Sequence, residues 1–126
     1  WFANFTYMKT SITNPHDADQ DGGTVPFAPE MIANAGFTYT APFGLSFTSM
    51  MNYNGGYYDS SSKAFRKKFE PGVLLSANIS MNVYEKDNSR VSLFVQLHNI
   101  TNNQYEMPWQ FRETGFATMA GLRATF

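Results

Sequence analysis

The strongest constraint on this chain is a two-residue alternation of side chains along its C-terminal segment, residues 114–126. Leu122 and Phe126 fall on one side of an extended backbone, whereas Arg123 and Thr125 fall on the other. Successive side chains of a β-strand point to opposite faces of its sheet. The segment therefore predicts one long strand that is apolar on one face and wetter on the other.

The same alternation recurs in five earlier segments, residues 1–12, 31–40, 45–57, 73–84 and 90–99. It is cleanest over residues 73–84, where Leu75 and Ile79 fall on one face and Asn78 and Asn82 on the other. We therefore predict an all-β, antiparallel chain of about six long strands.

The connections between these strands alternate in length. Long loops rich in Asp, Gly, Pro and Ser cover residues 14–29, 58–70 and 100–113, and short turns cover residues 41–44 and 85–89. Short turns at one end and long loops at the other are typical of up-and-down transmembrane barrels, whose strands need about 9–11 residues. We predict a segment of such a barrel. The alternative is a soluble antiparallel sandwich whose apolar faces form a core.

Composition is compatible with the membrane interpretation. Aromatic residues make up 17% of the chain and charged residues only 15%, below the usual quarter. No apolar run approaches the roughly 20 residues of a membrane-spanning helix. Because every second residue of a barrel strand faces inward, the mean hydropathy of −0.34 is also expected.

Several function classes have no support in the sequence. Without cysteine, disulfides, zinc ribbons and thiol catalysis are excluded. The net charge of −1 gives no support for a nucleic-acid partner. We find no nucleophile–base pair, no ligand-spaced partner for either His16 or His98, and no glycine-rich phosphate loop, so we predict no enzyme activity.

Six strands are too few to close a membrane barrel, for which about eight is the smallest known number. Two open edges in lipid would leave unpaired backbone groups at several kcal/mol each. The chain also begins at Trp1 without a signal-peptide pattern. We therefore expect residues 1–126 to be the C-terminal part of a larger barrel, unless several copies assemble to close one.

An acidic loop carries a candidate calcium site at Asp17, Asp19 and Asp21, followed by glycine. Carboxylates at alternate positions before a glycine are typical of a loop that wraps oxygen ligands around Ca²⁺. The usual twelfth-position glutamate would fall at Ala28, and Glu30 is a substitute for it. The alternative is a solvated acidic loop.

A basic group occupies the second long loop, at Lys63, Arg66, Lys67 and Lys68. It could meet lipopolysaccharide phosphates or an anionic ligand, or serve as a solubilising charge run.

The last long loop holds candidate ligand-binding residues, Trp109, Phe111 and Arg112. Aromatic rings and a guanidinium could stack on or clamp a ligand, whereas membrane anchoring and loop packing explain them equally well.

Three segments together resemble the C-terminal region of TonB-dependent receptors. They are residues 25–29 (VPFAP), residues 95–105 (VQLHNITNNQY), similar to that family's penultimate-strand motif, and residues 121–126. The last segment, with Gly121 and the terminal Phe126, resembles the signal that the outer-membrane assembly machinery reads.

The resemblance implies that these are the last six of twenty-two strands in an outer-membrane barrel of a Gram-negative bacterium. It also implies uptake of a siderophore, cobalamin or another scarce nutrient, powered by the TonB complex. The plug domain and the TonB-contacting segment are absent from this chain. Expected partners are outer-membrane lipid, lipopolysaccharide, and the rest of the barrel with its plug.

In the family's topology the three long loops are extracellular, and aromatic girdles flank the bilayer at both ends of the strands. Two alternatives stay open: another outer-membrane barrel or channel closed by oligomerisation, and a soluble β-sheet binding module with a calcium loop.

Overall fold

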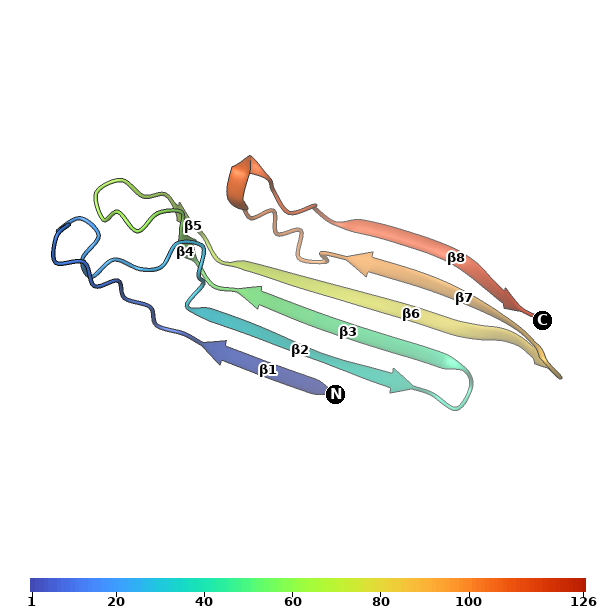
Figure 1. Cartoon of the computed structure of the whole chain (residues 1–126). Helices are drawn as coiled ribbons and strands as arrows, with labels where there is room; N and C mark the ends of the chain where they lie inside the picture. The colour runs from blue at the N-terminus through green and yellow to red at the C-terminus, as the bar shows by residue number, and fades with distance from the viewer.

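The computed structural model describes residues 1–126 and is built around one six-stranded antiparallel sheet (Figure 1). Its strands are β1 (Phe2–Tyr7), β2 (Met31–Thr40), β3 (Leu45–Asn54), β6 (Gly72–Lys86), β7 (Ser89–His98) and β8 (Ala117–Thr125). A second sheet pairs β4 (Tyr57–Tyr58) with β5 (Lys68–Phe69). The one helical element is the 3₁₀ turn η1 (Pro108–Gln110). No helix of the chain has the length and apolar character needed to span a membrane.

The six strands form a meander in which each strand pairs with the next long strand along the chain, in the order β1-β2-β3-β6-β7-β8. Short turns join β2 to β3 and β6 to β7 at one end of the sheet (Figure 1). The long connections, residues 8–30, 55–71 and 99–116, lie at the other end. The predicted all-β class, the antiparallel order and the alternation of connection lengths are confirmed.

The strand register gathers the apolar side chains on one face. Ile79 of β6 lies opposite Phe47 of β3 and Val95 of β7, and the next strand places Ala120 opposite Val95. Directly opposed residues of an antiparallel pair share a face. The same parity holds on β1 and β2, where Phe5 pairs with Ala33. An apolar face therefore extends across all six strands.

The opposite, polar face carries a ladder of amides and hydroxyls. Asn34 donates its Nδ2 to Asn4 Oδ1 at 2.8 Å and accepts from Asn52 Nδ2 at 2.6 Å. Thr38 and Thr48 share a hydrogen bond of 3.0 Å between their hydroxyls. These contacts cross from strand to strand, so they stabilise the register on the face that lacks apolar packing.

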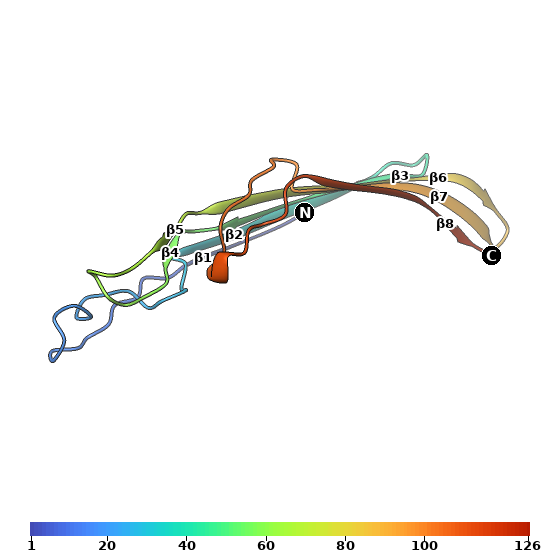
Figure 2. The same ribbon diagram turned by 90° about the horizontal axis from the view of Figure 1, so that it is seen from above.

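The sheet is a single layer with nothing packed on the apolar face. Seen nearly edge-on, it is one bent layer (Figure 2). Only 7 of the 126 residues are buried, and Leu122 on the apolar face is 70% exposed. The sheet is not closed, since β1 and β8 each have one unpaired edge. A chain with this architecture needs further surroundings to cover its apolar face and its two edges.

Two predicted strands extend too far at their loop ends. Residues 8–12 continue the alternation of β1, yet β1 ends at Tyr7, because its partner β2 begins only at Met31 and prolines at 26 and 29 precede it. Residues 55–57 were expected to continue β3. Instead, Gly55 and Gly56 interrupt it after Asn54, and Tyr57 starts β4.

The strand predicted over residues 31–40 has those bounds, and the remaining three differ by one to three residues at their ends. β8 begins at Ala117 rather than at residue 114, because the Thr114 carbonyl accepts from Asn99 and the Phe116 N–H donates to Asn102. β6 runs to Lys86 and contains a bulge at Val83, where the register shifts. The turn between β6 and β7 is consequently shorter than predicted, only residues 87–88.

Candidate functional site

Four aromatic rings from the three long connections meet at the loop end of the sheet. We call Phe27, Tyr57, Phe69 and Trp109 the aromatic cluster. The Phe27 ring stacks on Trp109 with centroids 6.4 Å apart and lies 6.2 Å from Tyr57 at a tilted angle. Tyr57 in turn stacks on Phe69 at 5.1 Å. Because each pair joins two different strands or loops, the cluster fixes the loops relative to one another.

The cluster is buried at one end and exposed at the other. Phe69 is 5% exposed, whereas Phe27 is 49% and Trp109 is 85% exposed. Both Phe27 and Trp109 have positive φ angles, 56° and 59°, which are uncommon for residues with a side chain. The Phe27 N–H donates to the Tyr58 carbonyl at 2.8 Å and holds this loop against β4. The result is an indole displayed toward solvent on an aromatic base.

Positive charge surrounds the aromatic cluster. Lys67 forms an ion pair with Glu106 of the last loop, and its Nζ lies 5.2 Å from the centroid of the Phe69 ring. The guanidinium of Arg66 lies 3.9 Å from the centroid of Tyr58. Beside Tyr57 and Tyr58 is a groove of about 280 Å³ that also contacts Glu30 and Lys68. Rings, cations and a groove together suit a partly aromatic or anionic ligand.

The last connection, residues 99–116, folds over the polar face. The Tyr105 ring packs against Gly72, whose register places it on that face. Burial raises the pKa of Tyr105, and the nearby Glu113 carboxylate and Tyr57 add to the rise. Burial also raises the pKa of Tyr57. Both phenols are therefore held in their neutral form where the loop meets the sheet.

The same loop contacts the polar face a second time through His98. Its Nε2 lies 3.4 Å from Glu113 Oε1, and its Nδ1 lies 3.5 Å from Ser76 Oγ. No pattern in the sequence predicts this chain of contacts, because the three residues are far apart along the chain. Both distances are at the long end of hydrogen bonding. The arrangement ties the loop to the sheet and does not resemble an activated nucleophile.

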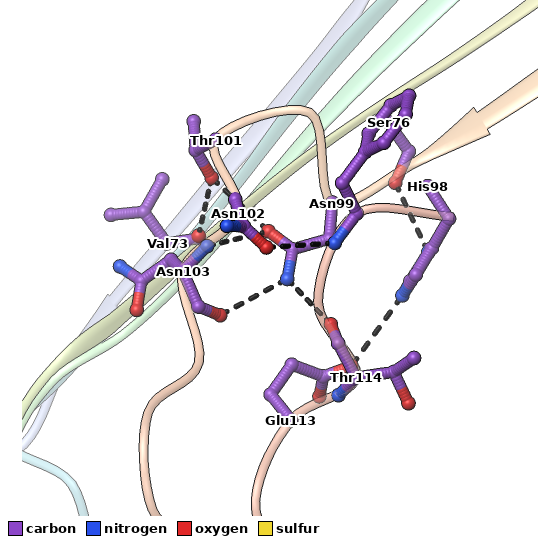
Figure 3. A network of polar contacts seen from close by, with 10 residues as sticks. Val73, Ser76, His98, Asn99, Thr101, Asn102, Asn103, Glu113 and Thr114 are labelled. Atoms are coloured by element: carbon purple, nitrogen blue, oxygen red, sulfur yellow. Dashed lines mark hydrogen bonds and ion pairs between the residues drawn. The ribbon is translucent and has the colours of Figure 1, made fainter. Parts of the chain in front are cut away.

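Asn99 organises the start of this loop (Figure 3). It is completely buried and has a φ of 49°. Its Nδ2 donates to the carbonyls of Asn103 and Thr114, at 3.0 and 2.6 Å, and its Oδ1 accepts from the Asn103 N–H at 3.0 Å and from the Thr101 hydroxyl at 3.2 Å. One side chain thus joins both ends of the connection and turns the chain out of β7.

Of the predicted ligand-binding residues, only Trp109 belongs to the aromatic cluster. Phe111 is 66% exposed, and Arg112 forms an isolated backbone bridge with Glu106. The residues that sequence reasoning missed are Phe27, Tyr57 and Phe69. No single-sequence pattern joins them, because Phe27 comes from the first long connection and Tyr57 and Phe69 from opposite ends of the second.

The three predicted calcium ligands accept hydrogen bonds from the protein. Asp17 Oδ1 accepts from the Asp19 N–H at 3.0 Å, and Asp21 Oδ1 accepts from the Asn14 N–H at 2.9 Å. The structure brings no three acidic, histidine or cysteine side chains together around a point that could hold a metal ion. Calcium binding stays a prediction, and it would require these hydrogen bonds to be exchanged for the ion.

Asp19 instead joins the first and second long connections, an arrangement we call the Asp19 clasp. Its Oδ1 accepts from the N–H groups of Lys63 and Ala64, at 3.0 and 2.8 Å. A hydrogen bond from Ser62, together with those two backbone donors and the charge of Lys63, lowers the pKa of Asp19. The acidic loop therefore has a structural role in this fold.

The basic group is largely engaged within the loops. Lys63 donates to the Asp21 carbonyl at 2.7 Å, and Lys68 lies 3.1 Å from Glu70. Arg66 and Lys67 have the contacts described above. Binding of lipopolysaccharide by these residues stays a prediction.

The predicted assembly-signal residues lie in and after the last strand. Gly121 lies in β8 opposite Phe94, and Phe126 follows β8 and is 92% exposed.

No protein-family model, curated protein or solved structure matches this chain.

Proposed function

We propose that this chain is a wall segment of an outer-membrane β-barrel of the TonB-dependent receptor type, with a function in nutrient uptake. The observation that carries the proposal is the continuous apolar face across all six strands, which no other part of the chain covers. Exposed apolar patches of this extent mark an interaction surface. Lipid hydrocarbon suits a face that is predominantly apolar and interrupted within β3 and β8 only by the short hydroxyl side chains of Ser49 and Thr118.

The lengths of three inner strands fit a bilayer, whereas the edge strand β1 has only 6 residues. β2, β3 and β7 have 10 residues each. Such a strand is about 33 Å long and, when tilted by about 45°, spans about 23 Å, close to the ~25 Å apolar band of these barrels.

Aromatic residues at the turn end also support the proposal. Tyr39, Phe43 and Tyr84 are 57%, 65% and 50% exposed, and each lies at or beside a turn. Exposed tyrosine and phenylalanine in this position are expected where a barrel meets the bilayer interface.

The polar face then suits an aqueous interior. Its amide and hydroxyl ladder needs water, and the last connection folds over this face rather than over the apolar one. In a barrel the aromatic cluster would lie at the outer mouth of the lumen. We propose that Trp109 and the cations beside the cluster contact an iron–siderophore complex, cobalamin or a comparable nutrient there.

The two unpaired edges call for more strands. Unpaired backbone groups in hydrocarbon cost several kcal/mol each, so β1 and β8 must find partners if the sheet lies in a bilayer. We propose that they are the remaining strands of one larger barrel, whose plug would connect the transport cycle to TonB. A barrel closed by several copies is the alternative arrangement.

The apolar face is tested with neighbouring residues of β7. Val95 lies on the apolar face and Gln96 on the polar face, and both are exposed in the isolated chain. In the native protein, expressed in a Gram-negative host, Val95→Arg should cost roughly 2–4 kcal/mol of folding in the membrane and lower its level there. The Gln96→Arg control should assemble normally. Equal assembly of both variants would contradict the membrane-wall proposal.

The receptor assignment needs a separate measurement. Intact mass of the native protein, with peptide mapping upstream of Trp1, should reveal a parent several times longer with a plug domain ahead of the barrel. A native mass equal to these 126 residues would exclude the larger receptor and favour several copies. A monomer that stays folded in plain buffer would favour a soluble module.

A further inference from the structure

A second site lies on the polar face near the turn end, far from the aromatic cluster. It is a groove of about 290 Å³ whose lining includes Arg90, Arg123, Asn82, Ser92 and Phe94, and no carboxylate. We call it the Arg123 groove. Because its lining supplies two guanidinium groups with amides and hydroxyls, its chemistry favours a negatively charged occupant.

One of the two arginines in the groove has no acidic partner. Arg90 is paired with Glu85, with 2.5 Å between Nη2 and Oε1. Arg123 takes part in none of the four ion pairs of the chain. It is directly opposite Ser92 in the register, and Arg90 is two residues before Ser92 on the same face. The groove therefore has one cation without a partner and a second cation nearby.

The unpaired guanidinium is positioned by its neighbours. Its Cζ lies 6.0 Å from the centroid of the Phe94 ring, within cation–π range. That ring lies over Gly121, where an added Cβ would come within 2.8 Å of Phe94 Cζ. Gly121 thus leaves room for an aromatic ring on the polar face, and the ring supports Arg123.

An amide donor is held beside it. The Ser92 hydroxyl donates to Asn82 Oδ1 at 2.8 Å, so the oxygen of this amide is engaged and its Nδ2 is left to donate. A guanidinium fork and an amide N–H on one face match the oxygens of a carboxylate or a phosphate.

We propose that the Arg123 groove binds an oxyanion, a carboxylate or a phosphate, through Arg123 with help from Asn82 and Arg90. Phe94, whose ring lies over Gly121, is a positioning residue for the guanidinium of Arg123. This inference concerns the polar face alone, so it holds whether lipid or a second protein layer covers the apolar face.

The test follows the side-chain Nε–H signals of Arg90, Arg112 and Arg123 in the ¹⁵N-arginine-labelled native protein, solubilised in nonionic detergent micelles. Sodium acetate and sodium phosphate are titrated separately, with sodium chloride at matched ionic strength as the reference. The Arg123 signal should shift and saturate with acetate, phosphate or both, and the anion that saturates identifies the source. Arg112, in the last loop, should follow the chloride reference.

Variants separate binding from folding. In Arg123→Gln the anion affinity, read at the Nε–H signal of Arg90 in the same groove, should be at least about tenfold weaker, as expected for a lost hydrogen-bonded charge. Phe94→Leu should weaken it less and leave the shift saturable, whereas Arg112→Gln should leave it unchanged. The amide spectrum of each variant must match the parent. An Arg123 signal that tracks chloride in the parent overturns the proposal, as does an Arg90 signal that saturates with unweakened affinity in Arg123→Gln.

Discussion

The ring of Tyr105 occupies the space that a side chain on Gly72 would fill. Gly72 is the first residue of β6, and Tyr105 belongs to the last long connection, so this contact joins a loop to the polar face of the sheet. A glycine within a strand has no side chain, so an aromatic ring from elsewhere in the chain can pack directly on the backbone there. The same packing recurs where Phe94 covers Gly121.

Gly72→Ala should therefore displace Tyr105. The added methyl overlaps the body of the ring rather than the end of a flexible chain, and overpacking of this kind costs about 1–3 kcal/mol. Guanidinium unfolding in detergent micelles measures the loss. The double variant Gly72→Ala with Tyr105→Ala serves as control, because removing the ring should recover the specific part of the penalty. Purely additive losses would show that the two residues do not interact.

Asn99→Asp should destabilise the start of the last connection despite its identical shape. A carboxylate cannot donate to the carbonyls of Asn103 and Thr114, so two part-buried hydrogen bonds are lost at a cost of about 1–3 kcal/mol. Hydrogen exchange at the amides of Asn103 and Phe116 should accelerate. Asn103→Ala is the matched control, since the Asn103 side chain has no hydrogen bond of its own and its loss should stay within about 0.5 kcal/mol. Slow exchange in Asn99→Asp would mean that another group closes the loop.

The regular part of the sheet could be predicted from sequence, because a two-residue alternation of apolar and polar side chains identifies both the strands and their apolar face. β2 has the predicted bounds, residues 31–40, and the face of Leu75 and Ile79 is apolar as expected. The strand ends could not be predicted, because they depend on whether a backbone group pairs with the neighbouring strand or with a side chain. Asn99 and Asn102 take the backbone groups of Thr114 and Phe116 away from the β8 ladder, and alternation contains no information about such side-chain bonds.

The Asp19 clasp should open in acid. The pKa of Asp19 lies below its ordinary value of 3.8, chiefly because Ser62 donates to the carboxylate. The clasp therefore contributes stability that is fully present above that ordinary value and is lost as the pH falls through the lowered pKa. The amide signals of Lys63 and Ala64 should shift only in that acidic window.

The control for this prediction is Asp59→Asn, which alters a carboxylate of the second long connection, one that accepts from the Lys67 N–H. It should leave the acid shift of Ala64 intact, whereas Asp19→Asn should remove it. If the amide shifts had their pH midpoint above 3.8, the pKa of Asp19 would be raised rather than lowered. The clasp would then not stabilise the fold at neutral pH.

The candidate site was predicted only in part, and for a physical reason. Trp109 is conspicuous in sequence, but the ring on which it stacks, Phe27, lies in a different loop and is brought close only by the topology of the sheet. Likewise, an Asp-x-Asp-x-Asp pattern suits both a calcium loop and a set of backbone caps. Only the position of residues 62–64 beside Asp19 shows the second use.

Stacking of Phe27 on Trp109, between the first and last connections, should hold the last connection more firmly than its ion pair with Lys67 of the second connection does. An aromatic pair is worth about 0.5–1.5 kcal/mol beyond its buried area, whereas an exposed ion pair contributes about 0–1 kcal/mol. Phe27→Ala should therefore accelerate chymotrypsin cleavage after Trp109 and Phe111 more than Lys67→Ala does. Phe65→Ala is the control, because that ring is 86% exposed and takes part in none of the ring stacks. Faster cleavage in Lys67→Ala than in Phe27→Ala would assign the coupling to the Lys67–Glu106 pair, and high salt should then loosen the loop as well.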